Sequence, residues 1–300
     1  MLRRLLGLLV AGAATLTVLP TTQATAAPVS AVAYLNTRQT DGGWTGASPF
    51  DTGGAVASVA VAADGGTLHV LTVATGWVFY RQRAADGSWT PTTVIDNGSF
   101  VTQVAAAVTP EGLQITTVAN GKVFHRVRSA AGSWTSPSLI DGGGGVTQVA
   151  LTGIGGTLNV TTLANGRVFH RVRWAGGSWT NPVLVDNGGG VGHISTANLG
   201  STLHLTTVGG GYVYHRTRSD SGVWSGLTLL DSGGRVVQAV LASSGTVVHL
   251  ATLANGKAFH RYYVESGAWT GPQLVDGAGS IRQISAAADS SGRFHLTTLT

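Results

Sequence analysis

Tryptophan recurs six times in this chain at an unbroken spacing of 45 residues, at Trp44, Trp89, Trp134, Trp179, Trp224 and Trp269. A constant period of this length indicates that one supersecondary unit is copied along the chain. Periods in the forties with short strand-like segments are typical of β-propeller blades. Candidate functional residues are therefore best found by comparing equivalent positions of the repeats.

One repeat, residues 141–185, contains the signals of four antiparallel strands. Residues 145–151 and 156–163 are expected to form the first two strands, and residues 167–173 the third. Asn165-Gly166 lies between the second and third strands and predicts a type I′ hairpin turn, in which both central residues need positive φ. A turn at Gly176-Gly177 then leads into a fourth strand, predicted over residues 179–185.

The two ends of the repeat region each match only half a unit. Residues 31–50 match the second half, residues 276–300 match the first half, and together they make up one 45-residue repeat. We therefore expect an all-β, six-bladed β-propeller in which the N-terminal and C-terminal half-blades pair and close the ring, removing free sheet edges. An open solenoid is the alternative, but it would not explain complementary half-repeats. The blades are predicted at about 51–95, 96–140, 141–185, 186–230, 231–275, and 276–300 with 31–50.

The N-terminus has the pattern of a secretory signal peptide. Arg3 and Arg4 precede an apolar stretch that ends at Pro20, and Ala24-Thr25-Ala26 is a small-x-small cleavage site. Residues 1–26 are thus expected to be removed, leaving residues 27–300 as a single secreted, extracellular domain. An uncleaved anchor is the alternative; no later segment is apolar enough to cross a bilayer.

Composition narrows the classes of partner. Without Arg3 and Arg4 the chain carries 16 basic and 13 acidic side chains, spread evenly. The resulting net positive charge is too small, and too evenly spread, for a nucleic-acid-binding patch. The chain contains no cysteine, so its fold is expected to rest on packing without disulfides.

Aspartate occupies one position in all six units: Asp51, Asp96, Asp141, Asp186, Asp231 and Asp276. Each starts a link from one blade to the next, where an Asp side chain readily accepts hydrogen bonds from backbone N–H groups two residues on. The sequence therefore favours a structural role for these aspartates, in Asx-turns. Calcium binding is the weaker alternative, because each link supplies one carboxylate and calcium needs several oxygen ligands.

The third strand of each unit carries an aromatic residue followed by two positions rich in arginine. Period-two spacing places them on one face of the strand. The second arginine position lies next to the turn before the tryptophan, so a cross-strand Arg–Trp stack is expected. Such arginines and tryptophans could serve packing alone, or could form a cradle for carbohydrate, with the ring against C–H groups and the guanidinium against hydroxyls. The first arginine position holds Arg81, Arg126, Arg171, Arg216 and Arg261; the aromatic position holds Tyr34, Phe79, Phe124, Phe169, Tyr214 and Phe259.

Two tryptophans depart from the repeat. Trp77 takes a position that is Lys or Arg in other units, and Trp174 lies at a hairpin tip. Both are candidate ligand platforms, or could pack on neighbouring loops.

Histidines at His125, His170, His215 and His260 belong to different blades, so no metal site is expected from them. Gln103, Gln148, Gln238 and Gln283 are expected to line the central channel or to satisfy backbone groups there.

No catalytic motif or cofactor motif occurs in the chain. It lacks a Gly-x-Ser-x-Gly elbow, a His-Glu-x-x-His motif, a phosphate-binding loop and a one-off cluster of carboxylates. Identical groups in every blade suit multivalent binding better than one active site.

Residues 156–180, with their GTLNVTTLANGRVFHRVR stretch followed by GSWT, resemble the repeats of secreted bacterial β-propeller lectins. The PLL-like group is the nearest, and tachylectin-like and fucose-binding propellers are more distant. The resemblance covers about residues 31–300. It implies sugar binding between adjacent blades, with stacking on the Trp44 to Trp269 position and hydrogen bonding by the Arg81 to Arg261 position. Two features depart from that group, which usually has seven blades and often a second aromatic after the hairpin tryptophan.

The sequence thus predicts a secreted lectin without catalysis, without cofactor or metal, whose partners are glycans or glycoconjugates. A protein-interaction or structural propeller of the cell envelope is the alternative. A polysaccharide-degrading enzyme is a third hypothesis, which would need two carboxylates about 5–10 Å apart on one face.

Overall fold

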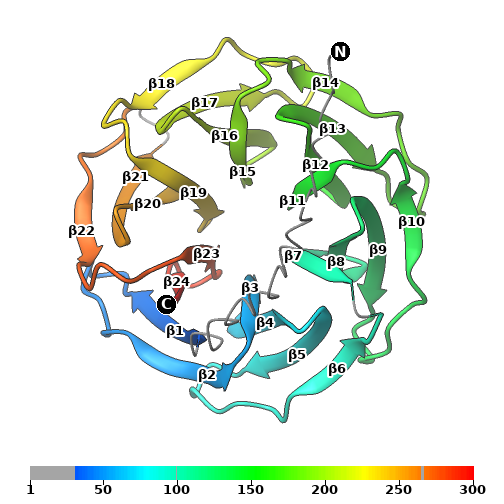
Figure 1. Ribbon diagram of the computed structural model, residues 1–300, viewed down its shortest axis with the longest axis horizontal. Coiled ribbons are helices and arrows are strands. Elements are labelled where there is room, and N and C mark those ends of the chain that lie inside the picture. Colours follow the sequence, from blue (N-terminus) through cyan, green and yellow to red (C-terminus); the bar gives the residue numbers. More distant parts are fainter. Residues whose placement is uncertain (1–30, 99, 265–266) are drawn as a thin grey trace, which may run out of the picture.

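A computed structural model describes residues 31–98, 100–264 and 267–300, and in these ranges the chain forms 24 strands in six four-stranded antiparallel sheets. The sheets are arranged radially around a central axis, as Figure 1 shows, and the fold is the predicted six-bladed β-propeller. In each blade the chain runs from the strand nearest the axis outward. The predicted signal peptide lies outside the described residues and stays a prediction.

Five blades are continuous in sequence. Their strands, from the axis outward, are β3 (Val56–Asp64), β4 (Thr67–Ala74), β5 (Trp77–Arg83) and β6 (Thr93–Asp96); β7 (Val101–Thr109), β8 (Gly112–Ala119), β9 (Lys122–Arg128) and β10 (Ser138–Asp141); β11 (Val146–Ile154), β12 (Thr157–Ala164), β13 (Arg167–Arg173) and β14 (Val183–Asp186); β15 (Val191–Leu199), β16 (Thr202–Gly209), β17 (Tyr212–Arg218) and β18 (Thr228–Asp231); β19 (Val236–Ser243), β20 (Val247–Ala254), β21 (Lys257–Val264) and β22 (Gln273–Asp276).

The sixth blade joins the two ends of the chain, as the half-repeats predict. Its strand order is β2 (Ser48–Gly54), β1 (Ala31–Arg38), β24 (Phe294–Leu299) and β23 (Gln283–Ala288). The pairing of β1 with β24 runs from Ala33 opposite Leu299 to Arg38 opposite Phe294, without a break. This ladder ties the N-terminal segment to the C-terminal strand and closes the ring.

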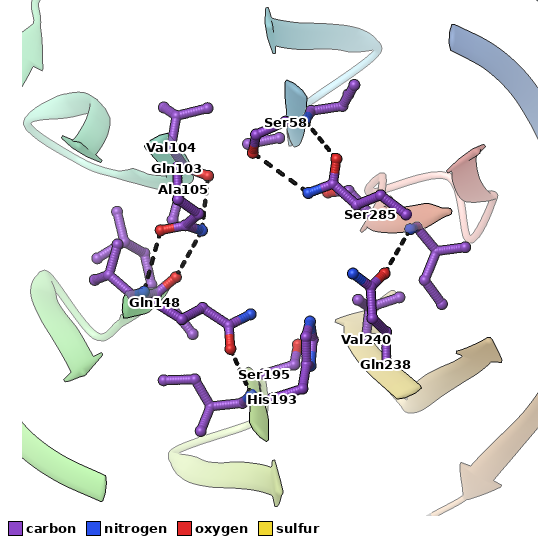
Figure 2. A pocket seen from close by; sticks show the side chains of 18 of the residues that line it. Ser58, Gln103, Val104, Ala105, Gln148, His193, Ser195, Gln238, Val240 and Ser285 are labelled. Carbon is purple, nitrogen blue, oxygen red and sulfur yellow. Dashed lines mark hydrogen bonds between the residues drawn. The ribbon is translucent and has the colours of Figure 1, made fainter. Parts of the chain in front are cut away.

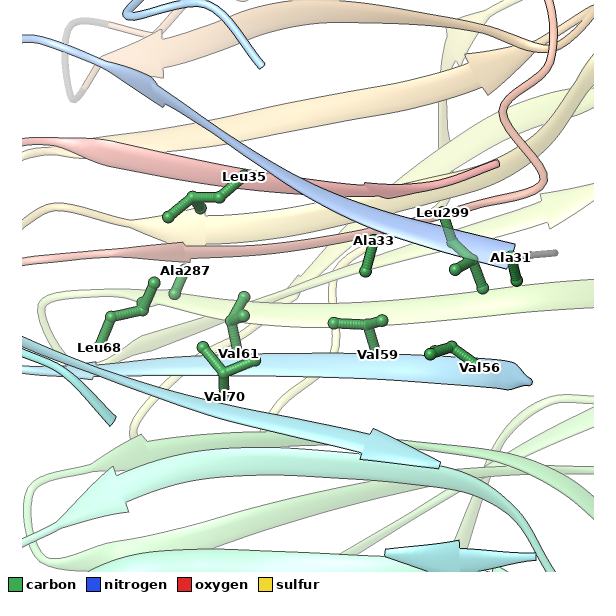
Figure 3. Packing of buried hydrophobic residues seen from close by; sticks show 10 residues of the cluster. All are labelled: Ala31, Ala33, Leu35, Val56, Val59, Val61, Leu68, Val70, Ala287 and Leu299. Carbon is green, nitrogen blue, oxygen red and sulfur yellow. The ribbon is translucent and has the colours of Figure 1, made fainter. Parts of the chain in front are cut away.

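Apolar side chains from neighbouring blades interlock to form the core. At the junction of the composite blade with the first continuous blade, Ala33 and Leu299 face Val59, as Figure 3 shows, and all three are at most 4% exposed. Equivalent clusters lie between the other blades. Each blade therefore buries its faces against two neighbours, and no blade has a complete core of its own.

The hairpins between the second and third strands have the predicted geometry. Asn165 and Gly166 have φ of 51° and 72°, and the Asn-Gly pairs at residues 120–121 and 255–256 are alike. In the first continuous blade the same turn is made by Thr75 and Gly76, at φ of 52° and 80°. A β-branched residue is strained there, which makes Thr75 a weak point of this blade.

The fourth strand is shorter than predicted. In the repeat of residues 141–185 it covers only Val183–Asp186, and Trp179 makes an isolated bridge to Arg173 instead of starting the strand. The strand is equally short at Thr228–Asp231, where no proline precedes it, so its length is common to the repeats and does not depend on Pro182. The Thr180 hydroxyl accepts a hydrogen bond from the Val172 backbone N–H, which holds the segment to β13.

Candidate functional site

Four cavities repeat at equivalent blade junctions, with volumes of about 290, 420, 200 and 340 Å³. Each is lined by the column aspartate of one blade, the glycine two residues later, and the phenylalanine in the third strand of the following blade. The aspartates are Asp141, Asp51, Asp231 and Asp96, and the matching phenylalanines are Phe169, Phe79, Phe259 and Phe124. The repeat thus places the same groups around several hollows of sugar-ring size.

The aspartates shape the link between blades, as predicted. In the link after β10, Asp141 Oδ1 accepts a hydrogen bond from the Gly143 backbone N–H at 3.1 Å, and the other five links have the same turn at 2.8–3.0 Å. The second oxygen of the carboxylate is left to face the next blade.

Arginine of the following blade binds that second oxygen. The Arg261 guanidinium donates to Asp231 Oδ2 at 2.7 Å and to the Leu230 carbonyl at 2.9 Å. Three other junctions carry the same ion pair at 3.3–3.4 Å: Arg126 with Asp96, Arg171 with Asp141, and Arg216 with Asp186. We call this contact the Asp–Arg clasp. It joins residues 30 positions apart and fixes one blade against the next.

The first arginine position also places guanidinium groups at the cavities. Arg81, Arg126 and Arg171 line three of them. At the composite blade Asn36 replaces the arginine, so the Asp276 link has no equivalent guanidinium. The predicted arginine position therefore has a structural role at four junctions and faces a cavity at three.

One junction differs in its aromatic content. The Arg81 guanidinium lies over the Trp89 ring, 4.5 Å from its centroid, and over the Phe50 ring at 5.3 Å. Trp77 stacks on Phe79 at 6.4 Å and is 39% exposed, so it extends the aromatic wall of this cavity towards solvent. The largest of the four cavities is itself lined by two aromatic residues, Phe50 and Phe79, and the cavity after β6 likewise by Phe100 and Phe124.

The six repeated tryptophans lie elsewhere. Each ring is half-buried and packs on the core between two blades. Trp179, for example, meets the edge of His125 of the preceding blade at 5.4 Å. None of the six lines the four cavities. Their packing role is clear in the structure, and their role in ligand binding stays a prediction.

The second arginine position pairs with tryptophan through the backbone, by isolated bridges such as Arg128 with Trp134, whereas the sequence predicted a side-chain stack. Its side chains reach instead to the preceding blade, where the Arg128 guanidinium lies 5.1 Å from the centroid of the Tyr80 ring. The Arg–Trp stack occurs at the first arginine position, between Arg81 and Trp89.

Trp174 follows the end of β13, whereas Trp77 begins the equivalent strand β5, so the two lie at opposite ends of the third strand. Trp174 is 52% exposed. Next to it, Glu111 of the preceding blade accepts from the Arg173 guanidinium at 2.5 Å and from the Gly176 N–H at 3.1 Å. These contacts hold the hairpin that carries Trp174, and Trp174 lines none of the four repeated cavities.

Histidines form hydrogen-bonded pairs inside the blades. His249 Nδ1 lies 3.0 Å from His260 Nε2, and His125 Nε2 lies 2.8 Å from Gln114 Oε1. Burial lowers the pKa of His249 to about 4 and that of His260 to about 3, so both are neutral at pH 7. Within the described ranges, no three His, Asp or Glu side chains gather in a way that could hold a metal ion. The same ranges contain no helix long and apolar enough to span a membrane.

Glutamines of the inner strands join the blades around the axis, as predicted. Figure 2 shows the channel of about 320 Å³ that they line. Each glutamine Oε1 accepts from a backbone N–H of the next inner strand, for example Gln148 from Ile194 at 2.8 Å. The same bond joins Gln103 to Val149, Gln238 to Ile284 and Gln283 to Val59.

The sequence reasoning did not assign the phenylalanine position to the site. The sequence did contain one indication: the phenylalanine lies two residues before the clasp arginine, and period-two spacing puts both side chains on the same face of the strand. The contact across the blade junction, which brings this ring to the aspartate link, could not be read from one repeat alone.

No protein-family model matches this chain, and no curated protein matches it. Solved structures do. The structure of YjhT is 13% identical with a TM-score of 0.55, over 79% of this chain and 88% of that one. A nidogen/laminin complex is 12% identical with a TM-score of 0.51, over 80% of this chain and 92% of that one. Trypanosoma rangeli sialidase in complex with 2,3-difluoro-KDN is 11% identical with a TM-score of 0.55, over 87% of this chain and 55% of that one, so this chain spans about half of that protein. At such low identity these matches establish the fold alone: the chain is a six-bladed β-propeller.

Proposed function

We propose that this protein is a non-catalytic carbohydrate-binding protein with several equivalent sites between its blades. The observation that carries the proposal is the recurrence of one cavity, built from aspartate, glycine and phenylalanine, at four blade junctions. A single active site would not need this repetition. Several weak sites on one rigid ring give avidity for a surface that displays many copies of a glycan.

The groups at the cavities suit sugar chemistry. A half-buried phenylalanine ring offers a flat apolar surface to the C–H face of a pyranose. In the cavity after β6, Asp96, Thr117 and Arg126 surround Phe124 with a carboxylate, a hydroxyl and a guanidinium, which can exchange hydrogen bonds with sugar hydroxyls. Because the clasp already orients Asp96 and Arg126, binding would require little further ordering of these side chains.

In this proposal the sugar stacks on the phenylalanine rings that line the cavities, whereas the sequence predicted stacking on the repeated tryptophans. At one junction Trp77 adds to the stacking surface. Export to the cell exterior belongs to the proposal too, and rests on the signal-peptide pattern of residues 1–26. Glycans or glycoconjugates are the proposed partners.

Two matched variants test the location of binding. Trp77→Lys installs the residue found at Lys122 and Lys257, and Trp174→Ser installs the residue found at Ser129 and Ser219, so both should fold. With the best ligand from a glycan array, we expect Trp77→Lys to weaken or remove one class of sites. Trp174→Ser should leave binding unchanged. The reverse pattern would place binding at the hairpin end of the blades and would overturn the cavity assignment.

A protein-interaction role is the second candidate, and one observation favours it. Apolar side chains repeat along the outermost strands and are 46–58% exposed, at Val94, Leu139, Leu184, Leu229 and Leu274. An exposed apolar rim can mark a contact surface. Loss of pull-down partners after replacement of rim residues by serine, together with a blank glycan array, would favour this candidate.

A further inference from the structure

The central channel contains hydrogen-bond donors that the fold leaves unused. Its lining comes from the inner strands of all six blades, and the described residues that line it carry no Asp, Glu, Lys or Arg. Polar groups there are amides, hydroxyls, backbone atoms and one histidine. The channel is therefore a polar but uncharged space on the axis of the molecule.

Backbone bonding determines how two of the glutamine amides are turned. Gln148 accepts from the Ile194 N–H, and Gln238 accepts from the Ile284 N–H, both at 2.8 Å. Only the oxygen of an amide can accept a hydrogen bond from an N–H group, so the –NH₂ group of each side chain must face away from the next strand. Figure 2 shows both nitrogens turned toward the open centre of the channel.

The other two glutamines use their –NH₂ groups within the protein. Gln103 Nε2 donates to the Val149 carbonyl at 3.1 Å, and Gln283 Nε2 donates to Ser58 Oγ at 3.3 Å. The unused glutamine amide donors are thus confined to one side of the channel, on β11 and β19.

His193 lies between them, on β15. Its Nδ1 accepts from the Ala239 N–H at 3.5 Å, which places the ring proton on Nε2. Burial lowers the pKa of this imidazole to about 4, so at pH 7 it is neutral and Nε2 is a donor. The side chain is only 8% exposed and its ring stands in the channel between the two glutamines, as Figure 2 shows. Three adjacent blades therefore each direct one N–H donor into the same space.

We propose that the channel binds a small monoanion, of the size of a halide, nitrate or carboxylate, held by Gln148 Nε2, His193 Nε2 and Gln238 Nε2. These three donors have no acceptor among the described residues, and an anion can satisfy several of them at once by charge-assisted hydrogen bonds. The absence of carboxylates from the lining removes the repulsion that such an ion would otherwise meet. The four glutamine oxygens are already bonded to the backbone and are therefore not free to bind a cation.

Near-isosteric substitutions separate this site from general ion binding. In the double variant Gln148→Glu/Gln238→Glu, one carboxylate oxygen can still accept from the backbone, while the second places negative charge where a donor stood. His193→Gln is the matched control. Glutamine occupies this position in four other blades, and it should keep both the backbone bond and a donor in the channel.

Chloride binding can be followed by the excess ³⁵Cl NMR line width of the intact protein. We expect saturable broadening that falls at least about tenfold in the double glutamate variant and is retained in His193→Gln. Equal broadening in the double glutamate variant, or no saturable broadening in the unaltered protein, would overturn the proposal. If the glutamate variant does not fold, the anion site can be tested instead with crystals of the unaltered protein grown in bromide. An anomalous peak within hydrogen-bonding reach of the three nitrogens supports the site, and a channel without one refutes it.

Discussion

Acid sensitivity follows from the buried histidines, and His249 allows a quantitative test. Its pKa in the folded protein is lowered to about 4, chiefly by burial, with a further contribution from Arg38. In the unfolded chain it should be near 6.5. Because the folded pKa is depressed, the unfolded state takes up the proton first as pH falls. The contribution of neutral His249 to the free energy of unfolding is therefore present above pH 6.5 and is lost as pH falls towards 4.

The size of the effect follows from these two pKa values. Protonation of the unfolded state lowers the free energy of unfolding by about 2 kcal/mol at pH 5 but by only about 0.2 kcal/mol at pH 7. One histidine thus accounts for a loss of about 1.8 kcal/mol between these pH values. The pKa of all nine histidines is lowered in the fold, so the complete protein should lose stability steeply over this range.

The chain offers a matched pair of variants for the test. Gln114 in another blade occupies the place of His249: it bonds His125 on one side and Thr109 on the other, as His249 bonds His260 and Ser244. His249→Gln should therefore keep both contacts while removing one titrating group. Gln114→His adds such a group.

Urea unfolding, followed by tryptophan fluorescence at pH 7 and pH 5, measures the outcome. Relative to the unaltered protein, His249→Gln should gain about 1.8 kcal/mol on going from pH 7 to pH 5, and Gln114→His should lose a similar amount. If both differences were independent of pH, the buried neutral imidazoles would not be the source of the acid sensitivity.

Three further predictions concern the ring itself. Thr75→Asn should raise stability by about 1 kcal/mol, or the melting temperature by about 2 °C, because asparagine tolerates positive φ better; an unchanged calorimetric melting temperature would speak against strain at this turn. Arg261→Asn should lower stability by about 2–4 kcal/mol in urea unfolding, since Asp231 loses its clasp; a loss below about 0.5 kcal/mol would show the clasp to be dispensable. Deletion of residues 31–50 should lower the melting temperature far more than loss of one hairpin tip, and equal effects would contradict closure by the composite blade.

The repeat made most of the fold predictable from the sequence. A constant 45-residue period, Asn-Gly turns and complementary half-repeats are local signals, and they led to the blade, the hairpin geometry and the closing pair of β1 with β24. The outer strand was predicted to start too early, because Trp179 and the residues after it look strand-like although Trp179 makes only an isolated bridge to Arg173.

The site was harder to predict, because it lies between blades. The Asp231–Arg261 clasp joins residues 30 positions apart, and neither column by itself indicates that they meet. For the same reason the tryptophans were favoured as stacking surfaces, although a ring such as Trp179 packs at a blade junction outside the cavities. The phenylalanines that line the cavities are less conspicuous in the sequence, and only the packing of one blade against the next distinguishes them.

Carbohydrate binding at the blade junctions is tested most directly by a calorimetric titration of the purified protein with the best ligand from a glycan array. We expect more than one site per chain. We also expect Phe124→Ala to lower the number of sites by one and to leave the affinity of the remaining sites unchanged. A well-folded protein that binds no glycan, or a number of sites unaffected when each of the four cavity phenylalanines is replaced in turn, would contradict binding at these cavities.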